Sequence, residues 1–174
     1  PGVALIGQRA MGITRASDPR PVLATQNLNM CVALHGYDRQ SKVGFLCHID
    51  FCFTVGNLKK LAEELTNHVR PGTRFSCTIT GGKPWTHARS PSIRGRIRKE
   101  LQFLNSQGRI QFDIEHETPM PDRWSRDVFL HKPFAYCLDT RSGNVRPFPN
   151  GKPSLPLKNL LSRLRFDYVF DQKG

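Results

Sequence analysis

Two amphipathic segments separated by an extended stretch constrain the fold of this chain most. In the first, NLKKLAEELTNHV, apolar residues recur at helical spacing, Asn57 is placed as an N-cap, and a Pro-Gly pair ends the pattern. In the second, SIRGRIRKELQFLNSQ, the isoleucines and leucines share one face, the arginines lie opposite, and Gly108 follows. The spacing predicts helices over residues 57–69 and 92–107.

Short apolar segments around these helices predict strands. Residues 109–115 alternate with period two, and residues 75–80 run as a strand into a pair of glycines. The segment after Cys31, VALHGYD, fits either a short buried helix or a strand, because a brief apolar run is ambiguous by period. Further strands are predicted over residues 8–16, 22–25 and 43–53, and on both sides of a turn at residues 139–144.

Helical and extended segments interleave without an internal repeat. We therefore expect an α/β (α+β) fold, a layered sandwich in which a mixed central β-sheet is flanked by the two main helices. The length suits a single domain, residues 1–174. Its C-terminal extension, residues 147–174, contains the amphipathic stretch LKNLLSRLRF, which predicts a terminal helix.

The chain is strongly basic, with a formal net charge of +12. Such a charge favours an acidic partner, and nucleic acid, an anionic membrane surface and an acidic protein all satisfy it. A merely solvated basic face explains the same charge. No apolar run approaches the roughly 20 residues of a membrane-spanning helix, and we see no secretory signal pattern at the start of the chain.

The five cysteines are odd in number, scattered and without a CxxC pair, so they do not indicate a disulfide framework. Most are expected to be reduced, buried thiols in a cytosolic protein. Cys31 differs because it stands where the polar stretch TQNLNM gives way to an apolar run. Three interpretations of Cys31 are open: a buried structural thiol, a metal ligand, or a nucleophile at the start of a helix.

Zinc binding is the first chemical alternative. Cys31 and His35, together with His48 and Cys52, imitate the paired spacing of a structural zinc site. On an extended strand, however, Cys52 would lie some 13 Å from His48, at about 3.3 Å per residue. A zinc site would need this strand to be broken, so the spacing favours other chemistry.

Nucleophilic catalysis needs a thiol, a base and a group that orients the base. Cys31, His48 and Thr25 supply these three types. If Cys31 begins a helix, the N–H groups of the first turn would face the reaction product and form an oxyanion hole. If Cys31 is the nucleophile, the site would lie where the Cys31 helix start meets the His48 strand, with Cys47 facing away from His48 into the core.

Three motifs occur in an order known from one family. They read TQNLNMCVAL over residues 25–34, KVGFLCH over residues 42–48 and TITGG over residues 78–82. This order resembles the chemotaxis-receptor glutamine deamidase family, CheD, whose signature is approximately TxLGSCVAV, then KVGxxxH, then a strand ending in Gly-Gly. The similarity covers about residues 22–82 and is only topological from 90 to 146.

The chain also departs from the family pattern in two places. Asn29 and Met30 replace the Gly-Ser that precedes the cysteine, which changes the loop beside the nucleophile. After His48, the residues Ile49-Asp50-Phe51-Cys52 stand where the family usually carries an apolar residue, Leu and Pro. The catalytic types are therefore retained while the substrate surroundings differ.

The resemblance implies a CheD-like cysteine hydrolase fold and a protein glutamine deamidase. Cys31 would attack the side-chain amide of a glutamine, His48 would serve as base and then acid, and Thr25 would orient the imidazole. A thioester would form, ammonia would leave, and water would complete hydrolysis to glutamate, without metal or cofactor. Asn29, Met30, Gly81 and Gly82 are expected to bind the substrate, and the two glycines also fit a simple strand-to-loop turn.

The expected partner is a protein with an accessible glutamine, either chemoreceptor-like or another acidic protein, and nucleic acid is the alternative. The enzyme is expected in the bacterial cytoplasm, with delivery into a host cell as an alternative, and without membrane insertion. Two other functions stay open. One is transglutamination through the same thioester; the other is a non-catalytic basic binding module on the same fold, which the loss of Gly-Ser before Cys31 favours.

Overall fold

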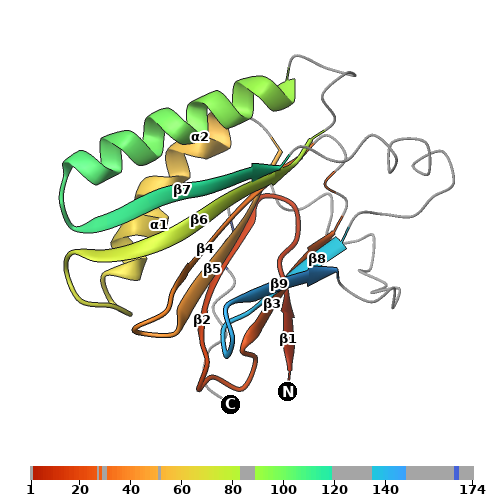
Figure 1. Cartoon of the computed structure of the whole chain (residues 1–174). Helices are drawn as coiled ribbons and strands as arrows, with labels where there is room; N and C mark the ends of the chain where they lie inside the picture. Colours follow the sequence, from red (N-terminus) through yellow and green to blue (C-terminus); the bar gives the residue numbers. More distant parts are fainter. Residues whose placement is uncertain are drawn as a thin grey trace, which may run out of the picture.

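The computed structural model describes residues 2–26, 28, 31–50, 52–82, 89–118, 135–147 and 167–168. These residues form two β-sheets and two α-helices in three layers (Figure 1). The helices cover one face of a six-stranded sheet, and a four-stranded sheet packs against its other face. The predicted mixed α+β class is therefore confirmed.

The six-stranded sheet is mixed, as predicted. Strands β2, β5, β4 and β6 are successively antiparallel, whereas β7 runs parallel to β6 and β10 runs parallel to β2. The order across the sheet is β10 (Asp167–Tyr168), β2 (Ala10–Arg15), β5 (Val43–Ile49), β4 (Val32–Asp38), β6 (Thr73–Gly81) and β7 (Ile110–Thr118).

The second sheet was not expected, because the sequence predicted one central sheet between the helices. In this four-stranded sheet β1 pairs parallel to β3, and β3 and β8 pair antiparallel although they lie more than a hundred residues apart in the chain. Such long-range pairing leaves no local pattern in a sequence. The order is β1 (Val3–Leu5), β3 (Val22–Gln26), β8 (Ala135–Asp139) and β9 (Asn144–Pro147).

The first helix, α1 (Leu58–Leu65), follows a 3₁₀ turn at Cys52–Asn57 and ends earlier than predicted. Asn57 is itself helical (φ −74°) and makes no side-chain cap, because the preceding turn leads straight into the helix. At the other end, Asn67 and His68 donate to carbonyls three residues back, so the chain continues as turns rather than as helix. The buried stripe Leu58, Leu61, Leu65 agrees with the predicted amphipathic face.

The second helix, α2 (Arg89–Ser106), agrees more closely with its prediction. Four apolar residues of its inner face are at most 4% exposed, whereas Phe103 is 54% exposed, and Gly108 adopts φ +73° just after the last turn, a conformation that glycine tolerates. The four buried residues are Ile93, Ile97, Leu101 and Leu104. The predicted terminal helix over residues 157–166 lies outside the described residues.

The ambiguous segment after Cys31 is strand β4, hydrogen-bonded to β5 on one side and β6 on the other. The predicted helix start at Cys31 is therefore wrong. A central strand satisfies its backbone groups with two neighbouring strands. Gly36 lets the Phe45 ring lie close to the β4 backbone, because a Cβ at Gly36 would overlap that ring. No helix in the described part of the chain is long and apolar enough to cross a membrane.

Side chains of β4 and β5 alternate between the two core layers. Val32 and Leu34 pack toward the helices, whereas Ala33 packs in the core between the two sheets. On β5, Cys47 is buried in the helix-side core. His48, the next residue, therefore points to the face between the sheets, and the prediction that Cys47 faces away from His48 is confirmed.

Replacing Gly36 with alanine is expected to destabilise the fold by about 1–3 kcal/mol, because overpacking forces buried groups to shift. The added Cβ would meet the Phe45 ring and would lie 3.0 Å from the Cys77 sulfur. Gly95→Ala is the matched control, since its Cβ would meet nothing within 4 Å on helix α2 and should stabilise by up to about 1 kcal/mol. Urea denaturation measures both changes, and equal stability of the two variants would contradict the packing argument.

Candidate active site

A hydrogen bond joins the two sheets at the centre of the candidate site. Thr25 of β3 and His48 of β5 are both buried, and their atoms Oγ1 and Nδ1 lie 2.9 Å apart. The structure thus brings together two of the three residues that the sequence singled out, although they are 23 positions apart and lie on different sheets.

The surroundings of Thr25 fix the tautomer of His48. The Thr25 hydroxyl donates its one proton to the Ile6 carbonyl oxygen, 2.9 Å away, since a carbonyl can only accept. The hydroxyl oxygen must then accept from His48, which places the ring proton on Nδ1 and a lone pair on Nε2. Nε2 is buried and has no hydrogen-bond partner among the described residues.

The electrostatic environment keeps this imidazole neutral. Burial lowers the pKa of His48 to about 4, and the nearby Asp50 carboxylate opposes that shift. At neutral pH the ring is therefore uncharged. Its Nδ1–H is hydrogen-bonded to Thr25, and the lone pair on Nε2 has no partner among the described residues. This is the state that a general base needs before it accepts a proton.

Cys31 lies on the same face of the six-stranded sheet as His48. It is partly buried, directly precedes β4 and packs against the core between the two sheets. Ala33 stands opposite His48, so Cys31, two residues earlier, is a diagonal neighbour of His48 across the β4–β5 pair. Diagonal neighbours are about 7–8 Å apart, and side chains can reach across that distance.

Gly81, at the end of β6, allows Leu28 and Cys31 to approach its backbone closely. It adopts φ +91°, and a Cβ there would lie 2.9 Å from the Cys31 carbonyl oxygen. Gly82 also has a positive φ and donates its N–H to the Leu28 carbonyl oxygen at 2.9 Å. Gly81 thus ends β6, and the two glycines lie beside the backbone of Leu28 and Cys31.

The other residues that the sequence singled out for substrate or metal binding are not part of this arrangement. Asn29 and Met30, expected to bind substrate, lie outside the described residues, as does the side chain of Cys52 from the zinc alternative. His35 instead contacts the Tyr136 hydroxyl, with Nδ1 at 3.2 Å from the oxygen. Across the described residues, no three His, Cys, Asp or Glu side chains are grouped so as to hold a metal ion.

Three residues that the sequence analysis missed gather beside Cys31. Asp50 is 3% exposed, and its Oδ2 accepts from Gln8 Nε2 at 3.0 Å and from Arg9 Nε at 2.6 Å. Gln8 Nε2 also lies 4.0 Å from the Cys31 sulfur. Asp50 could have been anticipated, because it is two residues after His48 and shares its face of the strand. Gln8 and Arg9 could not, because only tertiary folding brings them here.

The corrected secondary structure removes one expected element of the site. The sequence analysis placed Cys31 at a helix start, whose N–H groups would form the oxyanion hole. Cys31 instead leads into β4, where backbone N–H groups pair with adjacent strands. An oxyanion hole at Cys31, if the residue is a nucleophile, must draw its donors from elsewhere.

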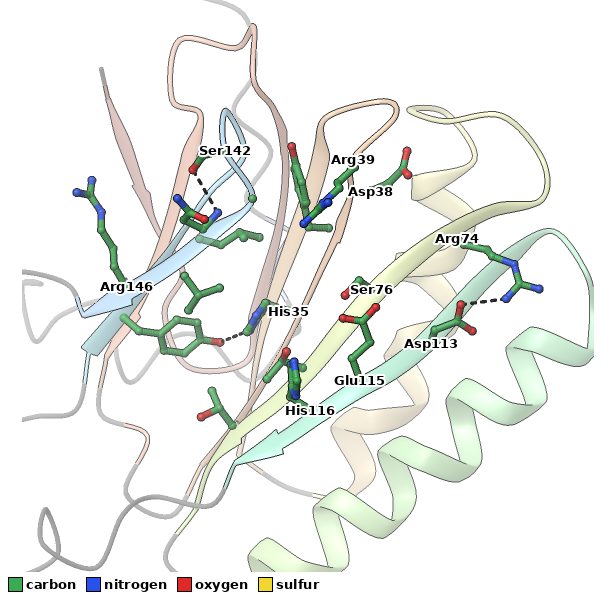
Figure 2. Close-up of a pocket in the computed structure, with 18 residues that line it drawn as sticks. His35, Asp38, Arg39, Arg74, Ser76, Asp113, Glu115, His116, Ser142 and Arg146 are labelled. Atoms are coloured by element: carbon green, nitrogen blue, oxygen red, sulfur yellow. Dashed lines mark hydrogen bonds and ion pairs between the residues drawn. The ribbon is translucent and has the colours of Figure 1, made fainter.

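A groove of about 940 Å³ opens on the same face, beyond Thr80 of β6, which stands opposite Ala33. Strands β4, β6 and β7 of the large sheet line it, together with strands β8 and β9 of the small sheet and the turn between them (Figure 2). Its charges are mixed: Asp38, Asp113 and Glu115 occur with Arg39, Arg74 and Arg146. The groove therefore does not account for the excess positive charge of the chain.

Comparison with known proteins adds no assignment: no protein-family model matches this chain, and no curated protein matches it. The resemblance to the receptor deamidases thus rests on the motifs, and the chemistry must be argued from the geometry of the site.

Because His35 and His48 are buried, we predict that the free energy of unfolding decreases in weak acid. Burial lowers the pKa of both His35 and His48 to about 4, against an ordinary value of 6.5. Between these pH values the unfolded chain binds more protons than the folded one, so stability is full above pH 6.5 and is lost as the pH falls toward 4. Each ring contributes up to about 1.4 kcal/mol per pH unit in this window.

Urea denaturation at several pH values between 7 and 4 measures this slope. His35→Gln retains a side chain that can bond to the Tyr136 hydroxyl and removes one titrating ring, so the part of the slope that His35 and His48 contribute should fall by about half. A slope unchanged by this substitution would contradict the assignment of His35 as a neutral buried ring.

Proposed function

We propose that this protein is a cysteine-dependent protein glutamine deamidase. The observation that carries the proposal is the hydrogen bond that His48 Nδ1–H donates to the Thr25 hydroxyl, which orients a neutral imidazole and leaves Nε2 without a partner on the face that bears Cys31. A buried histidine in a purely structural role normally has partners for its polar atoms. A ring bonded at one nitrogen and open at the other is suited to proton transfer.

The reaction would begin with proton transfer from the Cys31 thiol to His48 Nε2. The sulfur would attack the amide carbon of a glutamine side chain, and the protonated imidazole would give its proton to the departing ammonia. Water, deprotonated by His48, would then cleave the thioester to yield glutamate and the Cys31 thiol. Thr25 would hold the Nδ1–H throughout, so that the ring keeps the tautomer that the reaction needs.

A protein substrate fits this proposal better than a small amide. The net charge of +12 favours an acidic partner, and the groove beside Thr80 offers both donors and acceptors to an extended segment. The motif order supports a chemoreceptor-like or other acidic protein as the target. Action in a bacterial cytoplasm, or in a host cell after delivery, is part of the same proposal.

The competing proposal is a basic binding module without catalysis. It is favoured by the replacement of Gly-Ser with Asn29 and Met30 in the loop before Cys31, where a catalytic site would need a defined backbone. The two proposals differ in the chemistry of Cys31, because only the enzyme needs a thiol that attacks carbonyl carbon. Steep salt dependence of nucleic-acid binding, with no deamidation, would support the binding module.

Incubation with acidic candidate proteins is expected to release ammonia and to raise the mass of a target glutamine by about 1 Da. Cys31→Ser should abolish release. Thr25→Val, which lacks the hydroxyl, should lower kcat/KM by about 10²-fold or more, whereas Thr25→Ser keeps a hydroxyl and should retain most activity. Added primary amine tests transglutamination, since it would replace water at the thioester. Equal ammonia release by the wild-type protein and Cys31→Ser would refute the role of Cys31.

The value of kcat/KM is expected to decrease only at a pH well below 6.5, the ordinary pKa of histidine. His48 must be neutral to accept the thiol proton, and burial lowers its pKa to about 4. Activity should therefore persist at pH 5.5 and disappear as the pH falls through about 4 to 5, while circular dichroism verifies that the protein stays folded. An acidic limb centred at pH 6.5 or above would contradict neutral His48 as the base.

A further inference from the structure

The turn before β2 reaches into the candidate site. Ala10 donates its N–H to the Gly7 carbonyl oxygen at 3.1 Å, and Arg9, inside this turn, adopts the left-handed value φ +60°. The Arg9 N–H bonds to the His48 carbonyl oxygen at 3.0 Å, which attaches the turn to the end of β5. A non-glycine residue with positive φ is uncommon, and such residues often occur where a functional side chain must be aimed. Here the neighbouring side chain is Gln8.

The orientation of the Gln8 amide is determined by its partner. Asp50 Oδ2 lies 3.0 Å from Gln8 Nε2, and a carboxylate can only accept, so the NH₂ group of the amide faces Asp50. An NH₂ group has two protons. One is donated to Asp50, and the second is directed to the Cys31 sulfur, which lies 4.0 Å from the same nitrogen, at the outer limit of a hydrogen bond to sulfur.

Asp50 is itself held in place. Its side chain is 2% exposed, and Arg9 Nε donates to the same carboxylate oxygen at 2.6 Å. The other oxygen, Oδ1, is buried and finds no partner within the described part of the chain. A buried, ion-paired carboxylate has little freedom to turn, so it fixes the direction of the amide that it binds.

We propose that Gln8 is the side-chain donor of the oxyanion hole and that Asp50 is the positioning residue for its amide. The inference rests on the proposed function, because it needs Cys31 to attack a carbonyl carbon. It also supplies a donor in place of the helix start that the structure does not have. A spacing of 4.0 Å between nitrogen and sulfur leaves room for an oxygen on the carbon bonded to that sulfur, at the usual donor distance of about 2.7–3.1 Å.

In the first step, the sulfur–carbon bond would form and the π pair of the carbonyl would move onto its oxygen. Gln8 would donate its second N–H to that negative oxygen. As the pair returns, the bond from carbon to nitrogen would break, and ammonia would leave with the proton from His48. The same donor would serve again when water attacks the thioester.

Two electrophiles distinguish an oxyanion-hole donor at Gln8 from a residue that changes the reactivity of the Cys31 thiol in general. p-Nitrophenyl acetate acylates a cysteine through a negatively charged oxygen, whereas iodoacetamide alkylates it by displacing iodide from a saturated carbon, with no such oxygen. In Gln8→Met, which keeps the side-chain length but lacks the donor, acylation of Cys31 should slow by at least about tenfold, and deamidation by about 10²- to 10³-fold. Alkylation of Cys31 should stay within about twofold of wild type, because no oxyanion forms in that reaction.

The matched control is Gln40→Met, the same substitution at an exposed glutamine in the turn between β4 and β5, which should change neither rate. Mass spectrometry of the labelled protein assigns both reactions to Cys31. Equal losses of acylation and alkylation in Gln8→Met, or no loss of either, would overturn the inference while the proposed function stands. Wild-type protein acylated no faster than Cys31→Ser would overturn both.

Discussion

The hydrogen bond between Thr25 and His48 depends on how the two sheets pack. Thr25 lies on the small sheet and His48 on the large one, and each is buried in the layer between them. The apolar core of that layer sets the spacing between the sheets, so a bond of 2.9 Å requires the side chains to fill it correctly. The orientation of the imidazole is therefore a consequence of core packing as much as of the two polar residues.

The first residues of the chain complete this arrangement. Strand β1 pairs with β3, and beyond it the Ile6 N–H bonds to the Ala24 carbonyl oxygen at 2.7 Å. That bond places the Ile6 carbonyl next to Thr25, where it takes the hydroxyl proton. The same segment then turns at residues 7–10 and brings Gln8 and Arg9 to Asp50. A short N-terminal segment thus determines both the tautomer of His48 and the polar surroundings of Cys31.

Local patterns predicted the parts of the fold that depend on local interactions. Helix α2 and the apolar stripe of α1 follow from periodicity, because their burial repeats along the chain, whereas strand β5 follows from a continuous apolar run that is buried at every position. The identity of β4 did not follow, since only its position between β5 and β6 makes the extended form the stable one. The four-stranded sheet and the group Gln8, Arg9 and Asp50 depend on contacts between distant residues, for which periodicity gives no signal.

Charge around the imidazole explains how a threonine can stand where other triads use a carboxylate. Thr25 orients the ring but has no negative charge to stabilise an imidazolium. Asp50 has that charge and opposes the effect of burial on the pKa of His48, although its ion pair with Arg9 reduces its influence. The resting ring stays neutral for this reason, since burial outweighs a partly neutralised carboxylate. A charged imidazolium would then be favoured only when Cys31 becomes a thiolate beside it, so proton transfer and attack on the substrate would be coupled rather than separate steps.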